Sequence, residues 1–313
     1  MGWFIQRLLS ALLVIAVVVI SVFLLIHLIP GDPVDVMLGE TASVADRNAM
    51  RVAMGLNQPI TTQLMNYLQG LVTLDLGDSL HNNESIATLI QQRLPATAWL
   101  TLCALLLALA LAIPLGIASA VYRDQWIDRF AMFIALGGLS IPNFLLGPLL
   151  VLLFAILLKW LPVSGNEGVS HVILPALTLG LSMAAVLSRM VRSSLLESLG
   201  EDYVRTARAK GAKPLSVIWQ HAMRNAWLPV ITVIGAQLGA LLGGAVVTEI
   251  VFDWPGLGSL MIDSIQKRDY PVVQACVLLI SVSYVLVNTL TDMVYGLLDP
   301  RTRLGKPPGR AAG

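Results

Sequence analysis

The sequence predicts an all-α protein that crosses a membrane six times and carries a small folded cap after its first span. Three observations support this prediction. Apolar side chains make up 56% of the 313 residues and charged side chains only 12%, which is too apolar for a water-soluble domain of this length. The mean hydropathy is +0.77. Long charge-free runs alternate with polar connections, as expected when the bilayer is the solvent.

The first span is expected within residues 1–29, as the apolar run 8–29 that follows Arg7. As a helix this run would be about 33 Å long, enough to cross the hydrocarbon core. The run is longer than the core of a secretory leader and has no small-residue cleavage motif, so we expect it to stay in place. His27, near its outer end, is interpreted as an interfacial polar group.

Residues 30–93 form the longest segment between spans, and their pattern predicts a small external cap. An apolar stripe at helical spacing runs from Ile60 to Leu71, a Gly-Asp-Ser turn follows at 77–79, and a second short helix is expected near Ile86. A folded cap is therefore favoured over a loose loop.

Residues 94–297 hold the remaining five spans, and residues 298–313 form a polar tail. Pro114, Pro142 and Pro175 fall inside spans, which is tolerated where neighbouring helices pair the freed carbonyl groups, so the spans should form a bundle. The expected spans are 99–121, 130–158, 172–188, 226–248 and 271–291.

The fifth of the six spans has a glycine every four residues, at Gly235, Gly239 and Gly243. One face of this helix is therefore nearly free of side chains, and another helix can approach it closely. The partner is either a helix of the same chain or a second subunit beside a transport pathway, and the sequence leaves both open.

One polar and strongly basic segment, 201–229, lies between two apolar spans inside a loop that we place at 190–226. Its pattern predicts a short helix, a bend at Gly211 and a second helix that starts at Pro214. Small side chains would let the bend approach another protein, and arginine and lysine surround it. A basic hairpin on anionic lipid head groups is the alternative. The expected contact residues are Tyr203, Arg205, Thr206, Ala207, Arg208, Ala209, Lys210, Gly211 and Ala212.

The distribution of positive charge predicts the orientation. With six spans, fourteen of the 20 lysine and arginine side chains lie on the side that carries both termini and the basic segment. Positive charge is enriched on the cytoplasmic side of membrane proteins. Both termini are therefore expected in the cytoplasm, and the cap is expected to face outward.

The sequence offers no machinery for chemistry. It has no G-x-x-x-x-G-K-[ST] motif for binding the phosphates of ATP, and no nucleophile, base or paired-carboxylate constellation. Cys103 and Cys276 lie in apolar runs and are expected to be inert, while Glu249 and Asp292 sit at span ends, where capping or interfacial roles are expected. We expect no enzyme activity, no catalytic, metal or cofactor site, and no nucleic-acid partner.

Several stretches together resemble the permease subunits of binding-protein-dependent ABC importers, in the dipeptide, oligopeptide and nickel branch. The resemblance covers nearly the whole chain and is strongest in the basic segment, which is similar to the cytoplasmic coupling loop of these permeases. The stretches that carry it are 29–33, 94–97, 140–144, 203–211, 221–226, 228–229, 249–258 and 268–274.

The basic segment departs from the general importer pattern, which places Glu-Ala-Ala ahead of the glycine. This sequence has Arg205, Thr206 and Ala207 at those positions, and His221 and Met223 stand where the general pattern has its Ile-x-Leu-Pro. The carboxylate contact of the general motif is therefore not transferred to position 205.

The resemblance implies a type I ABC importer fold in a bacterial inner membrane. It implies a second, unlike permease subunit, two cytoplasmic ATPase subunits that bind ATP and Mg²⁺, and an external binding protein that meets the cap and the loop 253–270. Short peptides are the expected substrates, with a nickel chelate as the alternative. A self-sufficient secondary carrier or channel is the alternative outside this family. The polar residues expected along the pathway are Asn143, Ser182, Gln237, Thr248 and Asn288.

Overall fold

The computed structural model describes residues 2–28, 33–39, 42–82 and 84–298. Within this part of the chain every named element is a helix, and the one β pairing is an isolated bridge between Asp78 and Ser85. The motif at 29–33 lies almost entirely outside the described residues, as does the expected tail after Leu298.

Five helical stretches are long and apolar enough to cross a membrane, and a bent pair of helices brings the number to six, as predicted. The bent pair consists of α6 and of α7 with the π-helix η1, which turn by 103° at Pro142. The helices of the spans are α1 (Gly2–Leu25), α5 (Ile86–Val121), α6 (Trp126–Ser140), α7 (Asn143–Leu150), η1 (Val151–Leu157), α8 (Val169–Gly200), α11 (Met223–Val251) and α13 (Tyr270–Leu298).

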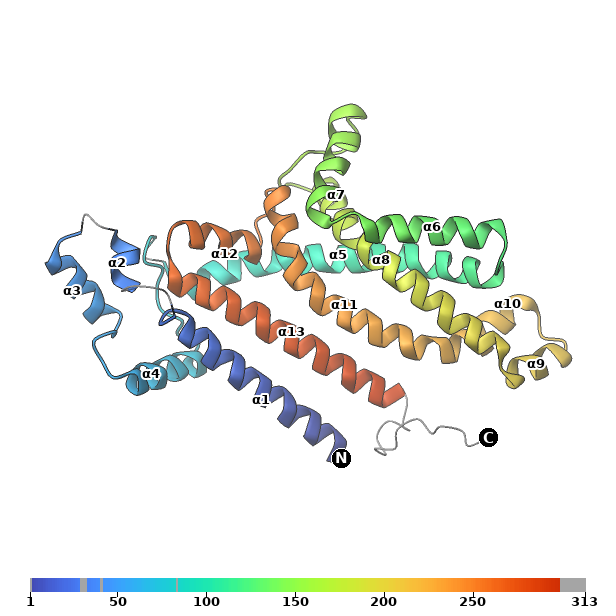
Figure 1. Ribbon diagram of the computed structural model, residues 1–313, viewed down its shortest axis with the longest axis horizontal. Helices are drawn as coiled ribbons and strands as arrows, with labels where there is room; N and C mark the ends of the chain where they lie inside the picture. The colour runs from blue at the N-terminus through green and yellow to red at the C-terminus, as the bar shows by residue number, and fades with distance from the viewer. Residues whose placement is uncertain (1, 29–32, 40–41, 83, 299–313) are drawn as a thin grey trace.

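Helix α8 is the centre of the bundle, with α5 behind it and α6 and α11 beside it (Figure 1). Glycines permit the close approach of α5 and α8. A Cβ atom on Gly180 would lie 2.9 Å from the carbonyl oxygen of Ala104, and one on Gly116 would lie 2.6 Å from the Cβ of Val191. Small residues four apart on α5, from Ala104 to Ala112, complete this contact and are fully buried.

Two of the predicted spans extend furthest beyond their expected limits. Helix α5 runs unbroken from Ile86 through Pro95, so the short helix expected near Ile86 and the span expected at 99–121 are one element. Helix α8 continues past the expected end at Ser188 to Gly200. The expected limits were set where charged side chains interrupt the apolar run, but a helix leaving the hydrocarbon core needs no apolar side chains to continue.

The three glycines that share one face of α11 lie in two different surroundings. A Cβ atom on Gly235 would lie 2.0 Å from Thr291, and one on Gly239 would lie 2.7 Å from the ring of Tyr284, so both glycines admit α13. A Cβ atom on Gly243 would meet nothing within 4 Å. The first two glycines thus serve a helix pair inside this chain, whereas Gly243 faces away from it.

The bundle has two distinct ends, which Figure 1 shows at its left and right. The cap end carries α2 (Pro33–Leu38), α3 (Val44–Ala53), α4 (Ile60–Thr73) and α12 (Leu257–Gln266). The opposite end, the elbow end, carries α9 (Asp202–Ala209), α10 (Pro214–Ser216) and the π-helix η2 (Val217–Ala222). The start of α1 also lies at the elbow end, where Arg7 forms an ion pair of 3.0 Å with Asp292 at the end of α13.

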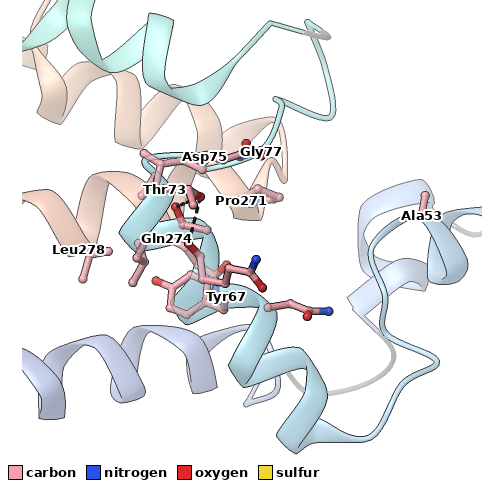
Figure 2. Close-up of a pocket in the computed structure, with 14 residues that line it drawn as sticks. Ala53, Tyr67, Thr73, Asp75, Gly77, Pro271, Gln274 and Leu278 are labelled. Carbon is pink, nitrogen blue, oxygen red and sulfur yellow. Dashed lines mark hydrogen bonds between the residues drawn. The ribbon is translucent and has the colours of Figure 1, made fainter.

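Helix α4 attaches the cap to the bundle. Tyr67 and Leu71, from the stripe that the sequence predicted, pack against Val19 and Val22 of α1 and Leu278 of α13. A cavity of about 610 Å³ opens beside this contact, and Figure 2 shows Tyr67 and Gln274 among its lining residues. Burial raises the pKa of the Tyr67 phenol to about 12, so the side chain is neutral at physiological pH.

Candidate coupling elbow and pathway face

The elbow comprises residues 202–222, and its inner side is apolar and tightly packed. Val204 of α9 and Val217 of η2 are buried against Leu195 of α8 and Ala120 of α5. Ala207, on the same side of α9, is also buried. Burial of these side chains attaches α9 firmly to the ends of α5, α8 and α11.

Gly211 ends α9 in the way that the sequence predicted. Its φ angle is +81°, a left-handed conformation that residues with a Cβ atom rarely adopt. The N–H of Gly211 donates to the carbonyl of Arg208 at 2.9 Å, and the N–H of Ala212 donates to that of Ala207 at 3.1 Å. These two bonds form a Schellman motif, which pairs carbonyl groups that the helix end would leave free.

The outer side of the elbow combines positive charge with exposed apolar side chains. Leu215 is 70% exposed and Trp219, one turn later, is 49% exposed. Arg205 forms an exposed ion pair with Asp202. Arg208 forms no ion pair among the described residues. The elbow therefore has an inner side bound to its own chain and an outer side open to a partner.

The nine predicted contact residues lie together on this elbow, but not all face outward. Seven of them are exposed, whereas Ala207 is buried and Ala212 is half-buried. The small size of Ala207 thus serves packing inside this chain. Gly211 is exposed and has open space around it, so its backbone conformation rather than crowding excludes larger residues there.

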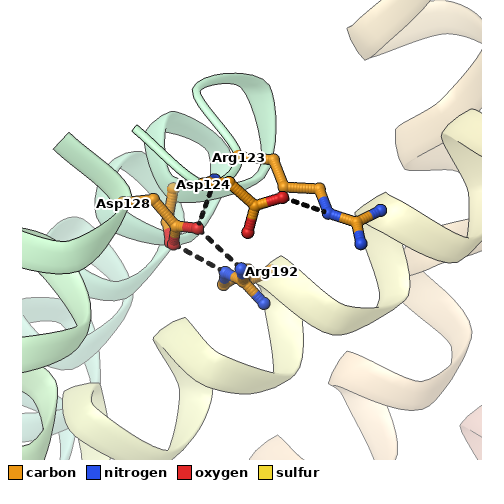
Figure 3. A network of polar contacts seen from close by, with 5 residues as sticks. Arg123, Asp124, Asp128 and Arg192 are labelled. Atoms are coloured by element: carbon orange, nitrogen blue, oxygen red, sulfur yellow. Dashed lines mark hydrogen bonds and ion pairs between the residues drawn. The ribbon is translucent and has the colours of Figure 1, made fainter. Parts of the chain in front are cut away.

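A buried ion pair lies next to the elbow and was not anticipated from the sequence (Figure 3). The Nε and Nη2 atoms of Arg192 on α8 each donate to Asp128 on α6 at 2.7 Å. Ser119 of α5 donates its hydroxyl to Asp128, and the N–H of Asp124 donates to it at 3.0 Å. The carboxylate thereby joins α5, α6 and α8. The available signal was the single acidic side chain in the first turn of α6.

A second buried carboxylate lies at the cap end. Glu249, near the end of α11, is fully buried and accepts the Thr97 hydroxyl at 2.6 Å. It also accepts the N–H groups of Gly258 and Ser259 at 2.7 and 3.0 Å, and the N–H of Leu257 donates to Thr97 Oγ1 at 2.8 Å. Glu249 therefore caps the start of α12, which confirms the capping role expected for it.

A groove lies on the open face of α8, between α6 and α11. Its cavity of about 580 Å³ is lined by Met132 of α6, by Val233 of α11 and by α8 residues that include Val186 and Arg189. Ser182 is half-buried and lies seven residues before Arg189, so it shares the groove face of α8. Gln237, also half-buried, lies one turn after Val233 on α11.

The other predicted pathway residues lie elsewhere. Thr248 is buried, and its hydroxyl has no hydrogen-bond partner within the described chain. Asn288 donates to the carbonyl of Tyr284 beside Gly239, on the opposite side of α11 from Gln237. Asn143 is half-buried at the first position of α7. Of the five residues, only Ser182 and Gln237 lie on the helix faces that adjoin the groove, each one turn beyond its lining residues.

A family model described as "Binding-protein-dependent transport system inner membrane component" matches residues 112–304, and the model of the N-terminal part of such components matches residues 1–101. The chain belongs to this family. It is a permease subunit of a binding-protein-dependent ABC importer in the peptide and nickel branch, as the sequence predicted.

Curated relatives match the permease along nearly its whole length. The glutathione transport system permease protein GsiC of Pectobacterium atrosepticum is 44% identical over 303 residues, which cover 97% of this chain and 99% of that protein. The protein of the same name from Escherichia coli K12 is 42% identical with the same coverage.

Among solved structures, the inward-facing MetNI methionine ABC transporter matches with a TM-score of 0.58 and 19% identity. The match covers 67% of the permease and 96% of that chain. A second crystal form of the same transporter gives a TM-score of 0.59. At this identity the likeness shows the fold, which is that of a type I ABC importer permease.

Proposed function

We propose that this permease forms half of the translocation pathway of an ATP-driven importer for short peptides, including tripeptides such as glutathione. A second, unlike permease would complete the pathway, two cytoplasmic ATPase subunits would bind ATP and Mg²⁺, and an external binding protein would deliver the substrate to the cap end. The proposal for the substrate rests on the relatives named for glutathione transport. A nickel chelate is the alternative cargo.

The orientation of the permease forms part of the same proposal. The excess of lysine and arginine at the elbow end supports a cytoplasmic elbow and cytoplasmic termini in a bacterial inner membrane. The cap and α12 would then face the binding protein.

The two-sided elbow is the observation that carries the proposed mechanism. Its inner side is packed on the ends of α5, α8 and α11, so a force applied to its outer side would move these helices as rigid bodies. An ATPase that closes on ATP would supply this force. The permease would open toward one side and then the other without chemistry of its own.

An experiment on Ala209 tests the coupling role. Ala209 is exposed on α9 and outside the left-handed turn, so Ala209→Trp adds bulk without backbone strain. In proteoliposomes that hold the complete importer, we expect normal folding and ATPase activity but uptake lowered by about tenfold or more, because overpacking a docked surface is unfavourable. Ala209→Ser is the control and should retain uptake.

The same assay separates an ATPase contact from a lipid contact. If the elbow met only anionic head groups, Ala209→Trp would leave uptake unchanged while Arg205→Glu and Arg208→Glu would lower it. Normal uptake by Ala209→Trp would therefore contradict the proposed coupling role.

The substrate is tested by competition. The complete importer should take up radiolabelled glutathione only with ATP, and unlabelled di- and tripeptides should compete with it. Uptake of a nickel chelate without glutathione uptake would favour the alternative cargo. The purified permease alone should take up neither under an ion gradient, whereas uptake by the chain alone would indicate a secondary carrier.

A further inference from the structure

The groove on α8 has apolar walls but contains two arginines. Met132, Val186, Met190 and Val233 supply the apolar surface. On α8, Val186, Arg189 and Ser193 follow at intervals of three and four residues and therefore share one face. The groove thus presents a row of α8 side chains between α6 and α11, with Ser182 one turn beyond the cavity toward the cap end.

The two arginines of the groove differ in whether an acidic side chain neutralises their charge. Arg192 is neutralised by Asp128, which it binds through two hydrogen bonds of 2.7 Å. Arg189 has neither an acidic nor a hydrogen-bonding partner for its side chain among the described residues, and no acidic side chain lines the cavity. The groove therefore carries one uncompensated positive charge.

Arg189 is exposed at the elbow end of the groove, so its charge can meet an anion that enters from the pathway. Arg192 is level with the first turn of α6, and Arg189 lies one turn, about 4.5 Å, closer to the cap end. Arg189 directly follows the apolar run that ends at Ser188, so it lies at the boundary of the span, where water reaches its side chain. A guanidinium group matches the two oxygens of a carboxylate, which it can bind through parallel hydrogen bonds.

We propose that Arg189 binds the carboxylate of the substrate in this groove, near the elbow end of the pathway. This inference rests on the proposed function, because a short peptide ends in a free carboxylate that a guanidinium group can bind. The cavity, about 580 Å³, is within the size range of small-molecule sites, and its apolar walls would contact the rest of the peptide. Arg189 would hold the substrate after the binding protein has released it and before it leaves toward the elbow end.

The direct test is equilibrium binding of radiolabelled glutathione to the complete, nucleotide-free importer without its binding protein. We expect Arg189→Gln to weaken binding by about tenfold or more, because a charge-assisted hydrogen bond is lost. Arg189→Lys keeps the charge but not the fork geometry, so it should fall between wild type and Arg189→Gln. Arg129→Gln is the matched control, since Arg129 is exposed on α6 and does not line the cavity.

A second arm changes the ligand instead of the protein. Glutathione diethyl ester, which has no free carboxylate, should compete weakly at the wild-type complex and should bind wild type and Arg189→Gln equally. Uptake assays should show a lowered maximal rate for Arg189→Gln, with unchanged stimulation of ATP hydrolysis by the binding protein.

The outcomes separate this inference from the proposed function. Equal binding of glutathione by wild type and Arg189→Gln, or of the ester and the free acid by wild type, would overturn the role of Arg189 while leaving peptide import intact. Failure of Arg189→Gln, but not of Arg129→Gln, to assemble would mean that Arg189 pairs with the second permease, which also overturns it. Absence of uptake of both glutathione and other short peptides by wild type would refute the proposed substrate class itself, and the carboxylate site with it.

Discussion

The permease holds two buried carboxylates at opposite ends of its bundle, and each joins three helices in a different way. Asp128, at the elbow end, is bound by a side chain of a distant helix, Arg192, with help from Ser119. Glu249, at the cap end, is bound by one hydroxyl, that of Thr97, and by two backbone N–H groups at the start of α12.

This difference determines which of the two interactions can be replaced by apolar side chains without loss of stability. A pair of charged side chains can be replaced as a pair by apolar residues of similar size, often without loss of stability. Backbone N–H groups are removed only by substitution with proline, so a carboxylate that caps a helix has no simple compensating side-chain exchange. The bond at the elbow end is therefore exchangeable, and that at the cap end is not.

The largest loss of stability is expected when only one residue of the buried Asp128–Arg192 ion pair is replaced. Arg192→Met leaves the Asp128 carboxylate, whose side chain is only 6% exposed, without its cation, and we expect the free energy of unfolding to fall by about 3 kcal/mol. Asp128→Leu combined with Arg192→Met should recover most of this loss. The free energies of unfolding of the single and the double variant are measured in mixed micelles. A double variant no more stable than Arg192→Met would show that the pair is not exchangeable.

A somewhat smaller loss is expected at the cap end. Glu249→Gln keeps the shape of the side chain but turns an amide NH₂ toward groups that are themselves donors, at a cost of about 2 kcal/mol. No second substitution should restore the stability. The measurement is the same unfolding experiment, with Glu249→Gln alone and combined with Thr97→Val. If the double variant were as stable as wild type, the interaction at the cap end would be as exchangeable as the ion pair at the elbow end.

Thr97→Val alone should have an effect of about 1 kcal/mol, because it removes one donor to Glu249 and the acceptor of the Leu257 N–H while keeping the side-chain volume. Hydrogen exchange at the start of α12 should increase in this variant. Unchanged exchange at Leu257 would indicate that its N–H finds another acceptor.

The smallest effect is expected for an exposed ion pair beside the buried one. Arg123 contacts Asp124 at 3.2 Å, but both side chains are mostly exposed, so Arg123→Met should leave stability unchanged within error. Thermal unfolding in detergent checks this. A fall in the unfolding temperature as large as that caused by Arg192→Met would mean that burial does not explain the different contributions of the two arginines to stability.

Local sequence patterns were sufficient to predict the membrane spans, the main cap helix and the helices of the elbow. Charge-free runs predicted the spans, and Gly211 with Pro214 predicted the bend between α9 and α10. These features depend on the backbone preferences of a few neighbouring residues.

The contacts between helices could not be predicted from such local sequence patterns. Asp128 and Arg192 are 64 residues apart in the sequence, and Thr97 and Glu249 are 152 apart, so no periodicity connects them. The start of α5 was placed too late and the end of α8 too early, because charged residues such as Arg93 and Arg189 interrupt the apolar run without interrupting a helix. Ala207 was assigned to a docking surface because its small size does not reveal which side of α9 it occupies.

Helix α8 is a single rod of 32 residues, about 48 Å long, and the elbow is attached directly to its end. A tilt of about 10° about one end would move the other end by roughly 8 Å, so a small displacement at the elbow is amplified across the whole thickness of the membrane. Because Asp128 clamps α6 to this rod, the two helices would swing as one lever arm.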